Sequence, residues 1–154
     1  MNMSPIDVSA SGMRAQRLRM DLIANNLANV DTTSARQEVR RTPDGQAYVR
    51  HLPYRRKVAV FMQGTPAKGD KVFGVATPLV LDDASPFRME HNESHPHAVP
   101  AASGEKDAGY VYFPNVHPIV ETVDMMSAAR AYEANLTAVD MYKSMNAATM
   151  RLLA

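Results

Sequence analysis

The chain has 154 residues, which is enough for one domain of ordinary size. Seventeen basic and sixteen acidic residues leave a net charge of +1. This charge is too small for a strong positive field that would attract nucleic acid or an anionic membrane. The absence of Cys excludes disulfides and a thiolate nucleophile. Eleven Met and no Trp suit adaptable helix interfaces, because Met is a flexible gap-filler.

Residues 1 to about 31 are predicted to form a helix. Ser4-Pro5 supplies the start, because Pro is favoured at a first helical position. Apolar residues follow in heptad-like steps, and the stripe consists of Ile6, Ala10, Met13, Met20, Ala24 and Leu27, widened by Ile23 and Val30. Such a stripe predicts a helix that packs against a partner helix.

Three asparagines lie within five positions at the end of this helix, namely Asn25, Asn26 and Asn29. Asn is a poor helix former, because its amide competes for backbone hydrogen bonds. Two interpretations follow from this pattern. The segment is a fraying helix end, or its amides make specific contacts between chains or to the partner helix.

The character of the sequence changes at Ser34. Seven of the ten Pro and five of the seven Gly lie between Ser34 and Ala108. Thr42–Gln46 is predicted to be a turn, because Pro presets one dihedral and Asp and Gly accept the tight positions after it. The flanking segments Arg36–Arg41 and Tyr48–His51 are charged and short, so we expect them to be mobile unless a neighbour covers them.

Several β-prone runs follow, separated by Gly, Pro and Asp. The predicted strands are Lys57–Met62, Val72–Ala76, Pro78–Leu81, Phe87–Met89 and Tyr110–Phe113. The expected fold class is therefore α+β, with a small antiparallel β-domain inserted between two terminal helices.

A second, longer helix is predicted after Pro118, where Gly and Pro no longer occur. Asn115 is expected to cap its first turn. The apolar stripe consists of Met125, Ala129, Tyr132, Leu136, Val139, Tyr142, Met145 and Leu152. A helix of roughly 50 Å needs a partner, so the two terminal helices are expected to form a coiled-coil-like pair.

Charged residues of this helix lie largely off the stripe and are expected on a solvated face. They are Glu121, Asp124, Arg130, Glu133, Asp140 and Lys143.

His91, His95 and His97 form the best candidate metal cluster. Their spacing matches no zinc motif and no helix arranges them, so a solvated loop is favoured and no metal is predicted. The sequence contains no motif for a nucleophile at a tight strand-to-helix turn and no recognisable catalytic triad. Neither catalytic residues nor a cofactor are therefore predicted.

No targeting segment is expected. Met1–Asp7 holds no basic residue and is not followed by a long apolar run, so no signal peptide is predicted. No stretch approaches eighteen apolar residues, so the chain is not expected to span a membrane.

Motifs at both ends resemble those of the bacterial flagellar axial proteins, which build the rod, hook and hook-filament junction. The N-terminal motif is Ala24–Thr32, and the C-terminal motifs are Gly109–Val116 and Glu121–Asn135. Two segments of the middle, Tyr54–Phe61 and Ser85–Arg88, also match. These motifs resemble the subunits of the proximal rod in particular, with His117 and Thr122 as departures from the usual Asn and Met.

The resemblance implies a structural subunit, not an enzyme, that polymerises helically into the proximal rod and transmits torque. The implied partners are other copies of the chain, proximal and distal rod subunits, the rod-base adaptor protein and the type III export apparatus. The implied location is the periplasmic rod, reached without a cleaved signal peptide. The implied domains are residues 1–33 and 114–154 as helices of the axial core and 34–113 as the inserted β-rich domain.

The predicted assembly interface combines the two stripes with the Asn motif. It consists of Ile6, Met13, Met20, Asn25, Asn26, Leu27, Asn29, Met125, Ala129, Arg130, Tyr132, Asn135, Leu136 and Val139. In the assembled tube, some of the charged residues of the second helix are expected to form ion pairs between subunits. Two alternatives remain from the residues alone: a monomeric helical adaptor or secretion chaperone, and a metal-dependent hydrolase that uses the three histidines.

Overall fold

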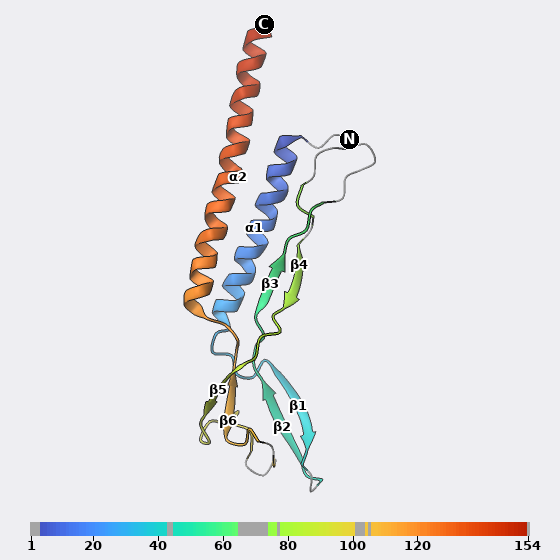
Figure 1. Ribbon diagram of the computed structural model, residues 1–154, viewed down its shortest axis with the longest axis vertical. Helices are drawn as coiled ribbons and strands as arrows, with labels where there is room; N and C mark the ends of the chain where they lie inside the picture. The colour runs from blue at the N-terminus through green and yellow to red at the C-terminus, as the bar shows by residue number, and fades with distance from the viewer. Residues whose placement is uncertain are drawn as a thin grey trace. The chain divides into compact units, whose positions relative to one another are not determined.

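A computed structural model describes residues 4–42, 45–64, 74–76, 78–100, 104 and 106–153 (Figure 1). The chain forms two compact units. The first comprises Met1–Ala24, Val58–Leu81 and Ile119–Ala154, and the second comprises Asn25–Lys57 and Asp82–Pro118. Two long helices and small two-stranded sheets give the predicted α+β fold class.

Helix α1 spans Pro5–Ala28 and begins where the sequence predicts. The Ser4 hydroxyl accepts a hydrogen bond from the Asp7 N–H at 3.3 Å, and the Asp7 carboxylate accepts one from the Ser4 N–H at 3.0 Å. This reciprocal pair satisfies two donors at the helix start. The hydrogen bonds from Ser4 lower the pKa of Asp7, because they favour its charged form.

Helix α2 spans Pro118–Leu153, so Pro118 takes the predicted first position. The expectation that Asn115 caps this helix is wrong. The buried Asn115 side chain accepts a hydrogen bond from the Arg56 N–H at 2.9 Å and donates to the carbonyls of Asp83 and Ser85. The Asn115 amide therefore forms its hydrogen bonds with two loop segments.

The two helices lie side by side and run in opposite directions (Figure 1). Arg19 and Asp124 form an ion pair at 3.1 Å between them. Closer to the N-terminus of α1, Gly12 lies against Asn135, and a Cβ on Gly12 would stand 3.0 Å from its Oδ1 atom. Glycine at this position therefore makes room for the Asn135 side chain against the backbone of α1.

Strand β3 (Lys57–Val60) pairs with β4 (Leu79–Asp82). Pairing continues past the strands, since Gln63 bridges Val75 and the Gly64 N–H donates to the Gly74 carbonyl at 2.7 Å. The predicted strand Lys57–Met62 is thus shorter than expected. Of the predicted strand Val72–Ala76, the first two residues lie outside the described residues, and Val75 forms only an isolated bridge.

Strands β1 (Arg36–Arg41) and β2 (Ala47–Leu52) form an antiparallel hairpin that the sequence did not predict. The predicted turn between them is confirmed at its described positions. The Thr42 N–H donates to the Gln46 carbonyl at 2.8 Å, and Gly45 has a φ of 82°. Pro43 and Asp44 of this turn lie outside the described residues.

Strands β5 (Arg88–His91) and β6 (Tyr110–Phe113) form the third antiparallel pair. The prediction for β6 is confirmed in its bounds, and β5 lies one to two residues beyond its predicted place. Gly109 precedes β6 with a φ of 78°, and a Cβ there would stand 3.0 Å from both His91 and Glu93. The described residues of the middle of the chain therefore form three separate strand pairs.

Candidate assembly surface

One face of α2 is covered by α1. The buried apolar side chains of the two helices are small or of medium size: Ala15, Ile23, Ala128 and Val139. Small side chains let helices approach closely but remove little apolar area from water. The helix pair therefore has a thin core.

A second apolar stripe of α2 is exposed. We call it the outer face, and it consists of Ile119, Val123, Met126, Ala134, Met141, Met145 and Leu152, with the charged Arg130 among them. At about 100° per residue these positions span about 100° of the helix circumference. Ile119 is 81% exposed and Leu152 is 87% exposed. Since a helix that is apolar on two sides requires two partners, the outer face is a candidate interaction surface.

The last part of α2 has no cover within the described chain. Val139 is the last buried residue, and every side chain from Lys143 to Leu152 is exposed. Figure 1 shows α2 continuing beyond the N-terminal end of α1. We call Lys143–Leu153 the overhang, which is about 16 Å long.

Many predicted interface residues line shallow grooves beside the helix contact. Met13 and Arg17 of α1 face Tyr132 in one groove, and Met20 faces Met125 and Tyr132 in the next. These methionines are half-buried. The two predicted stripes are thus brought together, and part of each is still reachable from outside.

The remaining predicted residues differ in burial. Val139 is buried; Ile6, Ala129 and Asn135 are half-buried; Leu27, Arg130 and Leu136 are exposed. Leu136 lies on the opposite flank of α2 from the outer face. Its role in assembly, like that of the other members, stays a prediction.

The charged residues of α2 do not all lie on a solvated face. Glu121 is 0% exposed, so the prediction for it is wrong, and Asp124 is held by Arg19 within the chain. Position 121 falls on the side that α1 covers, with Ala128 two turns further along. Arg130, Glu133, Asp140 and Lys143 are exposed as predicted.

The three asparagines of the N-terminal motif have different roles. The Asn29 side chain donates to the carbonyl of Asn25 at 2.9 Å and to its side chain at 2.8 Å, which closes the helix end locally. Asn26 is 1% exposed. Its Oδ1 atom accepts hydrogen bonds from the Lys57 N–H and the Tyr54 hydroxyl, and its Nδ2 atom donates to the Lys57 carbonyl, all at 2.9 Å.

These contacts of Asn26 lie within one chain. They fit neither a fraying end nor a contact to the partner helix, because Tyr54 lies just before β3 and Lys57 is the first residue of that strand. Asn26 thus holds this part of the chain by both of its amide groups.

A polar cluster joins β2 to β6 in the second unit. The Arg50 guanidinium donates to Asp107 and to the Tyr112 hydroxyl, each at 2.8 Å, and lies 4.9 Å from the centre of the Tyr112 ring. The Tyr112 hydroxyl also bonds Asp107. Burial and this carboxylate raise the pKa of Tyr112. The cluster therefore has a structural role.

The candidate histidines do not form a three-residue cluster, although the ring centres of His95 and His97 lie 5.2 Å apart. His91 pairs with Glu93 at 3.6 Å, whereas His97 stacks on His51 with ring centres 4.4 Å apart. The Nδ1 atom of His97 lies 2.7 Å from the Thr33 hydroxyl. Within the described ranges, no three His, Asp or Glu side chains are grouped so that they could hold a metal ion.

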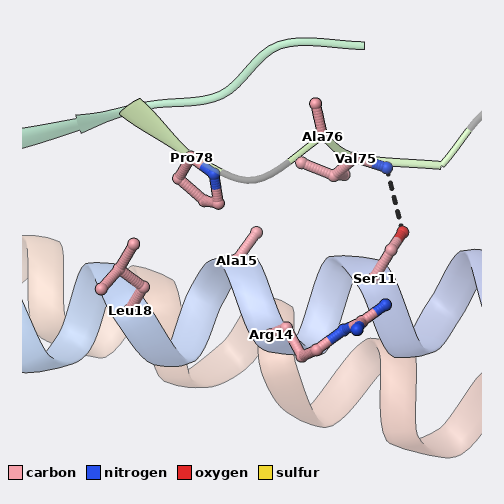
Figure 2. A pocket seen from close by; sticks show the side chains of 7 residues that line it. All are labelled: Ser11, Arg14, Ala15, Leu18, Val75, Ala76 and Pro78. Carbon is pink, nitrogen blue, oxygen red and sulfur yellow. Dashed lines mark hydrogen bonds between the residues drawn. The ribbon is translucent and has the colours of Figure 1, made fainter. Parts of the chain in front are cut away.

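A pocket of about 270 Å³ lies between α1 and the segment before β4 (Figure 2). Ser11, Ala15 and Leu18 of α1 point towards Val75 and Pro78. The Ser11 hydroxyl accepts a hydrogen bond from the Val75 N–H at 2.9 Å. Among the described residues, the lining holds one charged side chain, Arg14, and neither a carboxylate nor an imidazole, so these residues contain no acid–base pair.

Sequence reasoning missed most of the outer face. Ile119, Val123, Met126 and Met141 are exposed apolar residues of this face that were not in the predicted interface. Their spacing of three and four was visible, but the sequence shows no sign of which of two stripes a partner helix covers.

Comparisons with known proteins give one consistent result. A family described as "Flagella basal body rod protein" matches residues 6–36, and one described as "Flagellar basal body rod FlgEFG protein C-terminal" matches residues 107–152. The flagellar basal-body rod protein FlgC of Borreliella burgdorferi is 38% identical over 97% of this chain and 96% of its own length. The proteins of that name from Bacillus subtilis and Salmonella typhimurium are each 35% identical, over 91% and 95% of this chain and 90% and 93% of their own.

These matches define a structural protein of the flagellar basal-body rod. More narrowly, the chain belongs to the FlgC family of flagellar basal-body rod proteins. It is a rod subunit located in the basal body and not an enzyme, which rules out the hydrolase alternative. No helix in the described part of the chain is long and apolar enough to cross a membrane.

Proposed function

We propose that the chain polymerises helically into the proximal rod through its two terminal helices and transmits torque along it. The observation that carries this proposal is the exposed outer face of α2 with its overhang. A contact between two different surfaces of one subunit does not close on itself, so repetition generates a helical tube. The outer face and the shallow grooves beside the helix contact supply such a pair of surfaces.

The proposed axial core consists of residues 1–33 and 114–154, paired as a coiled coil, with 34–113 inserted between them in sequence. The antiparallel contact through Arg19 and Asp124 and the close approach at Gly12 support this pairing. Within the insert, Val58–Leu81 clusters with the helices, whereas the hairpin β1–β2 and the pair β5–β6 belong to the second unit. We assign assembly to the helices and spacing between neighbours to the insert.

The proposed partners are further copies of the chain, the proximal and distal rod subunits and the rod-base adaptor protein. Membership of the rod family supports assembly with other rod components. We further propose export through the flagellar type III apparatus, without a cleaved signal peptide, to the periplasmic part of the rod. A chain without cysteines suits passage through a narrow channel, because no disulfide can cross-link it.

Met141→Asp tests the assembly surface. Met141 lies on the outer face and is 58% exposed, so the substitution leaves the helix contact with α1 unchanged. Covering a carboxylate without a partner costs several kcal/mol by order of magnitude, so rods should not form. The measurement is the recovery of basal bodies from cells whose own gene is replaced by the variant.

Met89→Asp is the matched control. Met89 has nearly the same exposure, 54%, but lies on β5 in the second unit. Cells with this control should assemble rods. Normal rods with Met141→Asp would contradict the proposal. Loss of rods with both variants would show that rod formation does not depend specifically on the helices.

A further inference from the structure

The outer face of α2 carries two neighbouring exposed methionines. Met141 is 58% exposed and Met145 is 69% exposed, and the two follow each other at i and i+4. Residues with this spacing lie one above the other on a helix, with Cβ atoms about 6 Å apart. Their thioether sulfurs are therefore neighbours on the same exposed surface.

The chain offers oxidants no more reactive sulfur than these thioethers, because it contains no Cys. Methionines differ in their access to solvent. Met13 and Met20 are half-buried beside the helix contact, whereas Met141 and Met145 are exposed. Oxidation of methionine follows access to the sulfur and converts a flexible apolar side chain into a polar one.

We propose that Met141 and Met145 form a modification site at which reversible sulfoxidation blocks incorporation of the subunit into the rod. This inference rests on the proposed function, since it assigns the outer face to assembly. A hydroperoxide is the oxidant. The sulfur lone pair attacks one oxygen of hydrogen peroxide, and an S–O bond forms as the O–O bond breaks. The proton on the transferred oxygen passes to the departing hydroxide, which leaves as water.

The consequence follows from the position of the two sulfoxides. Each adds a strong dipole to a surface that becomes buried on assembly, and a buried polar group without a hydrogen-bond partner is unfavourable. A methionine sulfoxide reductase reverses the change, because its dithiol is oxidised to a disulfide while the oxygen leaves as water. An assembled subunit is protected, since its outer face is covered.

The first measurement uses the purified full chain. Limited exposure to hydrogen peroxide, followed by peptide mass spectrometry, gives an oxidation rate for each methionine. Met141 and Met145 should oxidise at least about fivefold faster than Met13 and Met20. Equal rates at all four positions would overturn the inference.

The second measurement uses cells in which synthesis of the subunit is induced under sublethal peroxide, with new basal bodies counted. Met141→Leu/Met145→Leu keeps the apolar volume but cannot form a sulfoxide, so it should keep assembling where the parent loses at least about half its rods. Met89→Leu removes a methionine of similar exposure on β5, and cells with this variant should lose as many rods as the parent. Equal loss with the parent and the double variant would overturn the inference.

A third variant separates the two proposals. Met141→Gln/Met145→Gln places polar groups on the same surface without any oxidant. If this variant assembles normally, the outer face is not an assembly surface and the proposed function fails. If it fails to assemble while the double Leu variant gives no protection, only the sulfoxidation site is wrong.

Discussion

The Asn26 side chain anchors the chain around Tyr54 and Lys57 to the end of α1. Both its amide oxygen and its amide nitrogen bond the backbone of Lys57, and the oxygen also accepts from Tyr54. Asn115 holds the neighbouring Arg56 N–H in the same way. Because backbone groups are the partners, the identity of residues 56 and 57 is less constrained than that of the two asparagines.

Asn26→Ala should lower the free energy of unfolding by about 1–3 kcal/mol, because the Lys57 backbone loses two partners in a buried place. An isolated N-terminal peptide with the same substitution should gain helicity, since Ala is the better helix former. Urea unfolding and peptide circular dichroism measure the two effects, and a swimming assay should show impaired rod assembly. Asn25→Ala, at an exposed position, is the control with a small effect. Equal losses for both variants would contradict the role of Asn26.

Gly12 and Asn135 should be coupled. Gly12→Ala gains about 1 kcal/mol of helix propensity, but its Cβ would stand 3.0 Å from the Asn135 Oδ1 atom. In the wild-type chain the substitution should therefore be neutral or destabilising. In an Asn135→Ala background it should stabilise by about 1 kcal/mol. Urea unfolding of the four chains gives the coupling, and identical effects in both backgrounds would show that the helices do not approach here.

His97 should make stability depend on pH. Burial, followed by the neighbouring His51 and His95, lowers its pKa from the ordinary value of 6.5. The folded chain therefore binds fewer protons at this site than the unfolded chain, so stability is full above about pH 6.5 and falls as pH decreases below it. Thermal unfolding at pH 8 and pH 5 should show a smaller decrease for His97→Phe than for the parent. His117→Phe, at an exposed position, should leave the decrease unchanged.

At the scale of the elements, Leu136 distinguishes the flank of α2 from its outer face. It is 44% exposed and lies in the stripe that the sequence assigned to assembly. Leu136→Asp should block rod formation while the strand pairs stay folded, because an unpaired carboxylate costs several kcal/mol only once another subunit covers it. Motility and basal-body isolation measure assembly, and proteolysis of the purified variant checks the strands. Swimming cells with normal rods would remove this flank from the interface.

Elements with strong local signals were predictable. The start of α1 at Ser4-Pro5, the start of α2 at Pro118 and the bounds of β6 follow from capping chemistry and periodicity. The hairpin β1–β2 was missed, because Arg36–Arg41 has no apolar alternation and its pairing depends on the turn and on contacts of Arg50. The burial of Glu121 and the bonds of Asn115 depend on tertiary neighbours that local rules do not contain.

At the scale of the whole molecule, stability is unevenly distributed along the helices. The buried apolar side chains of α1 and α2 are few and of small or medium size, and none of the described side chains of the overhang is buried. Isolated helices are marginal in water, so helical order depends on packing. Pairing the two ends of the chain also carries the entropic cost of closing a long loop. The free subunit should therefore be least ordered in its terminal helices, and above all in the overhang.

Amide hydrogen exchange on the dilute subunit tests this expectation. Exchange should be fastest in Lys143–Leu153, intermediate in the paired parts of α1 and α2, and strongly slowed in all three once rods have formed, because assembly covers the outer face and the overhang. The comparison between free and assembled chain controls for intrinsic exchange rates, since the sequence is the same. Strong protection of both Leu18–Leu27 and Tyr132–Val139 in the dilute subunit would show that the helix pair is already stable alone. Assembly would then join helices that are already ordered, and helical order in the rod would not depend on contact with neighbouring subunits.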